Sequence, residues 1–201
     1  MRLIAYDDLT APLPPAAVAL GTFDGVHLGH QALLRATKEA AGEKGLLPCA
    51  FTFDTPPAAM FGKAGAELLT DIGEKAALMG EYGIDTVIRC PFDLRVASRP
   101  AEEFFRDMLL GRLNARHIVI GFHYHFGQYA RGDARLMEAL CRQAGVGLTV
   151  VPPVRLPDGT LVSSSGIRER LMHNDRRGAE NMLNRALSSR EEALLGGGYN
   201  E

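Results

Sequence analysis

The chain has few cysteines, no long apolar run and no large excess of charge, and each absence excludes a class of protein. Its three cysteines, Cys49, Cys90 and Cys141, form no C-x-x-C pair, so they indicate neither a disulfide framework nor a closed zinc site. No apolar stretch is long enough to cross a bilayer, and the N-terminal residues lack the apolar core of a signal peptide. A net charge of −2 supplies no basic field for nucleic acid. We therefore expect a cytoplasmic enzyme that acts on small molecules and binds neither nucleic acid nor membrane.

The remaining composition is that of a folded α/β domain. With 201 residues, 46% of them hydrophobic and 23% charged, the chain can bury a full core. Short apolar runs alternate with stretches of helical spacing; the runs are 16–20, 48–53, 85–90, 117–121 and 147–151. This alternation predicts a five-stranded parallel sheet with helices on both faces. We expect one domain over residues 1–187, without internal repeats, and a flexible tail over residues 188–201.

Several local signals refine this outline. Asp71 followed by Glu74 is typical of a capped helix start. Pro157-Asp158-Gly159 predicts a turn inside a small hairpin. We expect a helix that opens within 162–168 and runs to about Met172, and a last helix over 177–187. Residues 58–66 look like an irregular loop that could cover a ligand.

Residues 19–30 are the stretch around which the chain is organised. They read as the end of a buried strand, a turn that contains Gly21 and Gly25, and a helix that begins near Gly29. His27 and His30 are three residues apart and so lie on the same side of the first helical turn. Exposed amides and the helix dipole make this position an anion site, most naturally for phosphates. Two imidazoles could add donors for charge that builds on a leaving pyrophosphate.

Other candidate residues follow the predicted strands. Thr52 and Asp54 end the second strand, although Asp54 could instead simply begin a turn before the prolines. Residues 122–127 form an aromatic and histidine-rich loop after the fourth strand. His123 and His125 alternate as in a two-histidine metal arm, but no third ligand is obvious, so we predict no metal site. Stacking on a flat heteroaromatic ligand fits the loop better, while a small core under the loop could account for Phe126.

Three serines open the helix after the predicted hairpin. Ser163, Ser164 and Ser165 can cap that helix, or they can bind phosphate beside Arg168, whose guanidinium suits bidentate contacts. Both candidate phosphate sites fall on one edge of the predicted sheet, so each supports the other.

The ordered motifs resemble a known family. Residues 21–30, Gly-Thr-Phe-Asp-Gly-Val-His-Leu-Gly-His, resemble the signature of the HxGH nucleotidyltransferase superfamily. Four further stretches, in order, resemble the adenylyltransferase module of the bacterial bifunctional riboflavin kinase/FAD synthetase family: 51–54, 69–75, 119–127 and 162–168. The resemblance spans about residues 15–187. It implies a Rossmann-like nucleotidyltransferase fold and the reaction of ATP with FMN to give FAD and pyrophosphate, with Mg²⁺, by direct in-line attack.

The resemblance also implies site roles. The implied catalytic residues are His27, His30, Ser164 and Arg168. The implied ATP-binding residues are Gly21, Thr22, Phe23, Asp24, Gly25, Gly29, Ser163, Ser165 and Ile167. The implied FMN-binding residues are Thr52, Phe53, Asp54, Phe122, His123, Tyr124 and Phe126. Residues 188–201 could not form the family's kinase module, so we expect FMN from a separate riboflavin kinase.

The chain departs from the family pattern on the acceptor side. Thr55-Pro56-Pro57 stands where the family usually has Pro-His-Pro, and His123 stands where Asp or Asn is usual. Gln128 and Ala130 replace a common Lys and a frequent Arg, and Ser165 replaces a usual Thr. Two other functions therefore stay open: a nucleotidyltransferase with a different phosphorylated acceptor, and a non-catalytic protein that binds nucleotide or flavin. An aminoacyl-tRNA synthetase is set aside because the chain shows no basic bias and no room for a tRNA-binding domain.

Overall fold

The structure is a computed structural model that describes residues 1–54 and 67–197. The predicted covering loop over 58–66 and the departure at Pro56 lie outside the described residues. In the described part of the chain, no helix is both long and apolar enough to cross a membrane.

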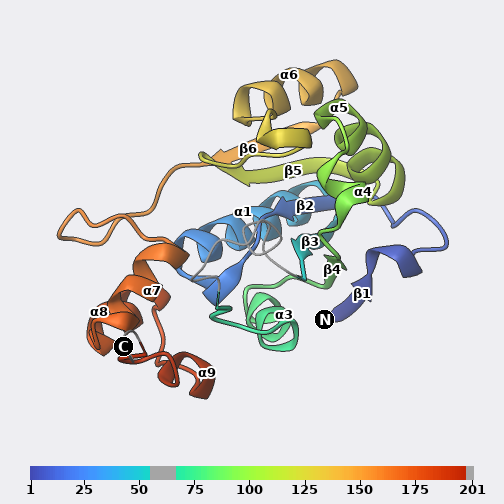
Figure 1. Ribbon diagram of the computed structural model, residues 1–201. Coiled ribbons are helices and arrows are strands. Elements are labelled where there is room, and N and C mark those ends of the chain that lie inside the picture. Colours follow the sequence, from blue (N-terminus) through green and yellow to red (C-terminus); the bar gives the residue numbers. More distant parts are fainter. Residues whose placement is uncertain (55–66, 198–201) are drawn as a thin grey trace.

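Within the described residues, the core of the fold is a parallel sheet of six strands in the order β1-β4-β3-β2-β5-β6 (Figure 1). The strands are β1 (Arg2–Ala5), β2 (Ala16–Leu20), β3 (Leu47–Phe53), β4 (Thr86–Cys90), β5 (Ala115–Gly121) and β6 (Gly147–Val151). The five predicted strands are confirmed, but the strand count was wrong because β1 was not foreseen. β1 is short and half-exposed, and it joins the sheet by pairing with β4 far along the chain, from Arg2 opposite Thr86 onward.

Helices cover both faces of this sheet. They are η1 (Tyr6–Asp8), α1 (Leu28–Lys44), α3 (Ile72–Glu81), α4 (Leu94–Ala97), α5 (Ala101–Glu103), η3 (Phe104–Arg112), η4 (Gln128–Ala130) and α6 (Ala134–Ala144). Val18 and Leu20 of β2 pack into one core with η3 and α6, whereas Ala19 packs into a second core with α1 and α3. This alternation is the two-residue period of a strand buried on both faces.

Local sequence explains where the main helices begin and end. The predicted capping box at α3 is confirmed, since Asp71 accepts from the Glu74 amide and Glu74 accepts from the Asp71 amide. α1 ends at Gly45, whose left-handed φ of 62° suits glycine. Asp133 caps α6 by accepting from the amide of Leu136.

The C-terminal elements pack together beside the sheet rather than on it (Figure 1). They follow the predicted hairpin, in which Leu156 and Thr160 are backbone-bonded, and comprise α7 (Ser164–Met172), α8 (Arg176–Leu183) and α9 (Ser189–Glu192). The expected helix over 177–187 ends early because Asn184 turns left-handed, with φ 54°. The described residues 188–197 also differ from the expected flexible tail, since they include α9 and the fully buried Glu191.

The strand order places a topological switch point between β2 and β5. From β2 the sheet runs outward through β3 and β4 on one side and through β5 and β6 on the other. Open parallel sheets bind ligands beyond the carboxyl ends of strands at such a point. The turn after β2 and the aromatic loop after β5 both lie there.

Candidate active site

The turn after β2, which contains the element η2 (Asp24–Val26), has an unusual backbone. Phe23, Gly25 and Val26 all have positive φ, at 50°, 78° and 44°. Left-handed geometry is strained for a β-branched residue such as Val26 and persists only where the surroundings enforce it. The buried Asp24 carboxylate contributes, because its Oδ1 accepts from the amides of Leu69 and Thr70 at 3.0 and 3.2 Å.

His27 and His30 form a stacked pair at the start of α1. Nδ1 of His27 caps the helix by accepting from the His30 amide at 3.3 Å. Neutral His27 therefore carries its proton on Nε2, which leaves an N–H donor on the other side of the ring. The two ring centroids are 3.7 Å apart, with planes inclined by 15°.

Burial keeps both imidazoles uncharged. It lowers the pKa of His27 to about 4. Burial also lowers the pKa of His30 well below its ordinary value, and repulsion from Lys75, and from His27 once it is protonated, acts in the same direction. At neutral pH the pair thus offers hydrogen-bond donors without a net positive charge.

A first cavity, which we call the phosphate cavity, lies where the starts of α1 and α7 meet. It has a volume of about 360 Å³ and is lined by Thr22, Asp24, His27, Ser163, Ser164, Ser165 and Arg168. Both predicted phosphate motifs are therefore brought together. Two helix N-termini with their unpaired amides make this a favourable place for an anion.

The three serines at the start of α7 have different contacts. Ser163 caps α7 by accepting from the Gly166 amide at 3.1 Å, so the capping alternative is confirmed for this residue. Ser164 donates to the carbonyl oxygen of Asp24 at 2.9 Å, which ties α7 to the strained turn. Ser165 is exposed at the cavity wall.

Arg168 is held in place by a carboxylate rather than left free. Its Nη2 forms an ion pair with Oδ2 of Asp24, and its Nε donates to the carbonyl oxygen of Glu67 at 2.8 Å. The Asp24 side chain is only 3% exposed, so this pair is largely buried. Asp24 thus anchors Arg168 and the turn.

Lys75 is a buried charge beside the same turn. Its side chain comes from α3 and is only 2% exposed. Burial lowers its pKa, while the charges of Asp24 and Asp54 act in the opposite direction. Lys75 lies in the stretch 69–75 that resembles the family, but no role was predicted for it from the sequence.

A second cavity, the central cavity, opens from the His pair toward β5 and β6. Its volume is about 400 Å³, and the predicted residues that line it are Gly21, Thr22, His27, Gly29, His30, Phe53, Phe122, His123, Tyr124 and Ser163. Sequence reasoning missed its other wall, which residues 151–154 form directly after β6. Pro152 and Pro153 were the available signal, since they follow a predicted strand just as the other candidates do.

A third cavity, the aromatic cavity, adjoins the central one. It has a volume of about 490 Å³, and Phe53, Tyr124 and His125 line both cavities. Further lining residues include Phe92, Leu94, Val96, Ala97, Phe104, Phe126, Gln128 and Tyr129. Sequence reasoning missed the part of the aromatic cavity wall that follows β4. The available signal was again the end of a predicted strand, at Cys90 and Pro91.

In the described residues, no cluster of three or more His, Cys, Asp or Glu side chains could hold a metal ion.

Some predicted site residues line none of these three cavities. Ile167 is fully buried in the C-terminal core, and Gly25 faces Leu69 and Leu183. Phe23 is buried beneath the turn, with its ring 5.2 Å from that of His30.

The end of β3 is likewise more structural than predicted. Thr52 donates to the carbonyl oxygen of Thr22 at 3.0 Å, which fixes the strand end to the turn. Asp54 pairs with Arg89 of β4 at 2.9 Å. Phe126 stacks on Tyr124 at 5.9 Å and packs near Phe104, so it belongs to a small core under the loop as well as to the aromatic cavity wall.

Comparison with known proteins agrees with this geometry. The family model described as FAD synthetase matches residues 10–166. A putative bifunctional riboflavin kinase/FMN adenylyltransferase of Geobacillus thermodenitrificans is 36% identical over 157 residues, which are 78% of this chain and 83% of that protein. The FAD synthetase of Listeria monocytogenes is 34% identical over 170 residues, 84% of this chain and 68% of that protein. The chain spans about half the length of bifunctional relatives such as that of Pseudomonas fluorescens, at 34% identity, 83% of this chain and 53% of that protein.

Solved structures show the same fold. A Streptococcus pneumoniae crystal structure described as a macrolide-efflux protein has a TM-score of 0.82 and 27% identity, and the match covers 93% of this chain and 63% of that one. A pantothenate synthetase from Thermus thermophilus shares the fold alone, with a TM-score of 0.52, 18% identity and coverage of 92% and 82%. The fold is thus a Rossmann-like nucleotidyltransferase fold, and the chain belongs to the FAD synthetase family.

Proposed function

We propose that this chain is an FMN adenylyltransferase, which transfers AMP from ATP to the phosphate of FMN and releases pyrophosphate. One observation carries the proposal. In the stacked pair, His27 lines both the phosphate cavity and the central cavity, and His30 lines the central cavity. The central cavity in turn shares Phe53 and Tyr124 with the aromatic cavity. A dinucleotide product, in which a pyrophosphate joins a flavin ring to an adenosine, needs a phosphate site next to space for flat rings.

On the nucleotide side, ATP phosphates would occupy the phosphate cavity. The Nε2–H of His27, the amides that open α1 and α7, and the Ser165 hydroxyl would donate to phosphate oxygens. Arg168, oriented by Asp24, would add a positive charge whose direction is already fixed. The adenosine would extend into the central cavity.

On the acceptor side, the isoalloxazine ring of FMN would lie in the aromatic cavity. Phe53, Tyr124 and Phe126 offer ring faces or edges there. The FMN phosphate would then point along the central cavity toward the His pair, and the exposed His123 stands on that route.

The chemistry requires positioning more than covalent participation. An oxygen of the FMN phosphate attacks the α-phosphorus of ATP, and the bond from that phosphorus to the β-bridging oxygen breaks, so pyrophosphate leaves with the electron pair. The enzyme holds the two phosphates in line and offers His27 and His30 to the charge that develops on pyrophosphate. No covalent enzyme intermediate is formed.

Magnesium enters the reaction as part of the substrate, MgATP. The phosphate cavity does not fit a resident magnesium site, because its carboxylate, Asp24, already accepts from two amides and pairs with Arg168. We further propose that a separate riboflavin kinase supplies FMN and that the reaction takes place in the cytoplasm, where ATP is available.

The binding half of this proposal can be tested without turnover. FMN fluorescence is titrated with protein, alone and with an ATP analogue that carries a methylene bridge between the α- and β-phosphorus. We expect saturable quenching by the aromatic cavity, with weaker binding of riboflavin, which lacks the phosphate. Unchanged FMN fluorescence with folded protein would refute the flavin assignment and favour a different acceptor.

A further inference from the structure

The strained turn after β2 is held by side chains at three successive carbonyl oxygens. The carbonyls of residues 24–26 each accept a hydrogen bond from a side chain outside the turn. The donors are Ser164 Oγ at 2.9 Å, Arg185 Nη2 at 3.2 Å and Gln31 Nε2 at 3.0 Å, in that order. Ser164 and Arg185 both come from the C-terminal elements, so the turn depends on residues far along the chain.

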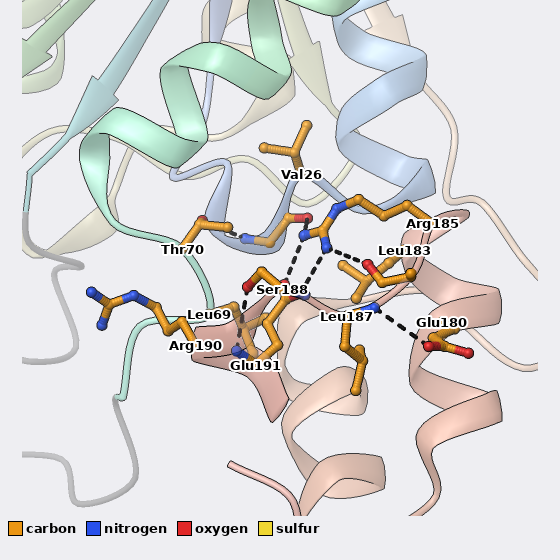
Figure 2. A network of polar contacts seen from close by, with 12 residues as sticks. Val26, Leu69, Thr70, Glu180, Leu183, Arg185, Leu187, Ser188, Arg190 and Glu191 are labelled. Carbon is orange, nitrogen blue, oxygen red and sulfur yellow. Dashed lines mark hydrogen bonds and ion pairs between the residues drawn. The ribbon is translucent and has the colours of Figure 1, made fainter. Parts of the chain in front are cut away.

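Arg185 is itself fixed by a fully buried carboxylate (Figure 2). Its Nη1 and Nη2 donate to the two carboxylate oxygens of Glu191, each at 2.7 Å. The same carboxylate accepts from the amide of Ser188 at 2.9 Å, which completes the capping box of α9. A two-point contact of this kind fixes the plane of the guanidinium and not merely its distance.

The contact of Arg185 falls next to Val26, the β-branched residue of the turn that has a positive φ. Gly25 and Val26 both have positive φ, and Arg185 bonds the carbonyl that joins them. Leu183 packs against Gly25 from the same side, and Gln31 also donates to the Leu183 carbonyl at 2.8 Å. The end of α8 and the residues just after it thus fix the turn by hydrogen bonds and by packing.

We propose that Arg185, oriented by Glu191, is a positioning residue for the ATP-phosphate site. It lies outside the lining of the phosphate cavity; it holds the Gly25 carbonyl and thereby sets the direction in which His27 and the first amides of α1 face that cavity. The segment lies beyond residues 10–166, which the family model matches. This inference rests on the proposed function insofar as the cavity binds ATP phosphates.

The chain offers a matched control. Arg176 also pairs with an acidic side chain of α9, donating to Glu192 at 2.8 Å, and its ion pairs within the described residues go to Glu180 and Glu192 rather than to the turn. Losing Arg176 therefore loosens α9 without releasing Gly25. Arg185→Lys keeps the positive charge but cannot form the two-point contact, and Glu191→Gln keeps the shape while weakening the hold on Arg185.

The experiment measures MgATP affinity by calorimetry without FMN, FMN affinity by fluorescence, and thermal stability. For Arg185→Ala we expect about tenfold or more weaker MgATP binding, since small misplacements of a binding group are costly. FMN affinity should be unchanged. Arg185→Lys and Glu191→Gln should lose less MgATP affinity than Arg185→Ala, and Arg176→Ala should bind MgATP like the parent protein.

Three results would separate the alternatives. If the parent protein does not bind MgATP, that result refutes the proposed function itself, and the positioning role falls with it. If it does, and Arg185→Ala binds MgATP equally well, or both Arg185→Ala and Arg176→Ala weaken MgATP and FMN together, the positioning role is refuted. If Arg185→Ala does not fold, Arg185→Lys and Glu191→Gln decide, because normal MgATP affinity in both would also refute the role.

Discussion

The imidazole rings of His27 and His30 are stacked with their centroids 3.7 Å apart, and Nδ1 of His27 accepts a hydrogen bond from the backbone amide of His30. The hydrogen bond fixes the tautomer of His27, and burial in the fold keeps both rings neutral. The pair is therefore a set of aimed donors rather than a cationic patch. Its contribution should appear mainly when negative charge develops on the leaving group.

Replacing His30 tests that contribution. His30→Ala should lower kcat by about 10²–10³-fold, which is the usual cost of removing one donor to a developing charge. MgATP affinity should change much less, because ground-state binding is shared by the helix N-termini. His173, an exposed histidine whose Nδ1 lies 2.8 Å from the Glu169 carbonyl, provides the control in His173→Ala. A His30→Ala variant with normal steady-state turnover would contradict the assigned role.

Acid should destabilise the folded chain through His27. The unfolded chain takes up a proton near the ordinary pKa of 6.5, whereas the folded chain does so only near 4. Stability is therefore complete above about 6.5 and is lost as pH falls toward 4. Asparagine is a good helix cap without a titrating group, so His27→Asn should reduce the dependence of the urea midpoint on pH across this window, and the buried His30 accounts for the dependence that remains. His173→Asn should retain the parent slope, and an equal slope in all three proteins would contradict the assignment.

The buried pair of Asp24 and Arg168 predicts a specific pattern of stability. Arg168→Ala leaves a carboxylate buried without its partner, which should cost about 3–5 kcal/mol in the free energy of unfolding. Asp24→Asn in the same chain removes that charge, while the amide oxygen can still accept from Leu69 and Thr70. The double variant should therefore be more stable than Arg168→Ala alone. Denaturant unfolding that ranks the two the other way would show that Arg168 does not serve to pair Asp24.

Filling the aromatic cavity should separate the two substrates. Ala97 lines this cavity at the end of α4, so Ala97→Trp should raise the KM for FMN by about tenfold or more, by loss of the volume needed for a flat ring. The KM for ATP should stay near that of the parent. Ala139→Trp on the exposed face of α6 serves as the control for adding a tryptophan. Unchanged FMN kinetics in Ala97→Trp would place the flavin elsewhere.

Sequence patterns predicted the parts of the fold that local physics decides. The five predicted strands are short, largely apolar runs, and the start of α3 follows from one capping pair. β1 escaped prediction because a short, half-exposed edge strand depends on its partner β4, which is 84 residues away at the contact between Arg2 and Thr86.

The candidate site was predictable in outline but not in its division of labour. The motifs located both sides of the phosphate cavity, because strand ends and helix starts share one edge of the sheet. They could not predict that Asp24 would form an ion pair with Arg168, or that Ile167 would face the C-terminal core. Nor could they foresee α9, because the burial of Glu191 depends on a tertiary contact with Arg185.

The most direct test is to incubate the purified chain with MgATP and FMN and to measure FAD and pyrophosphate together over time. The account predicts that both products appear at equal rates, and that riboflavin, which lacks the attacking phosphate, gives neither. Folded protein that binds MgATP but forms no FAD from FMN would contradict the central claim and show that another acceptor, or binding alone, is the function of this site.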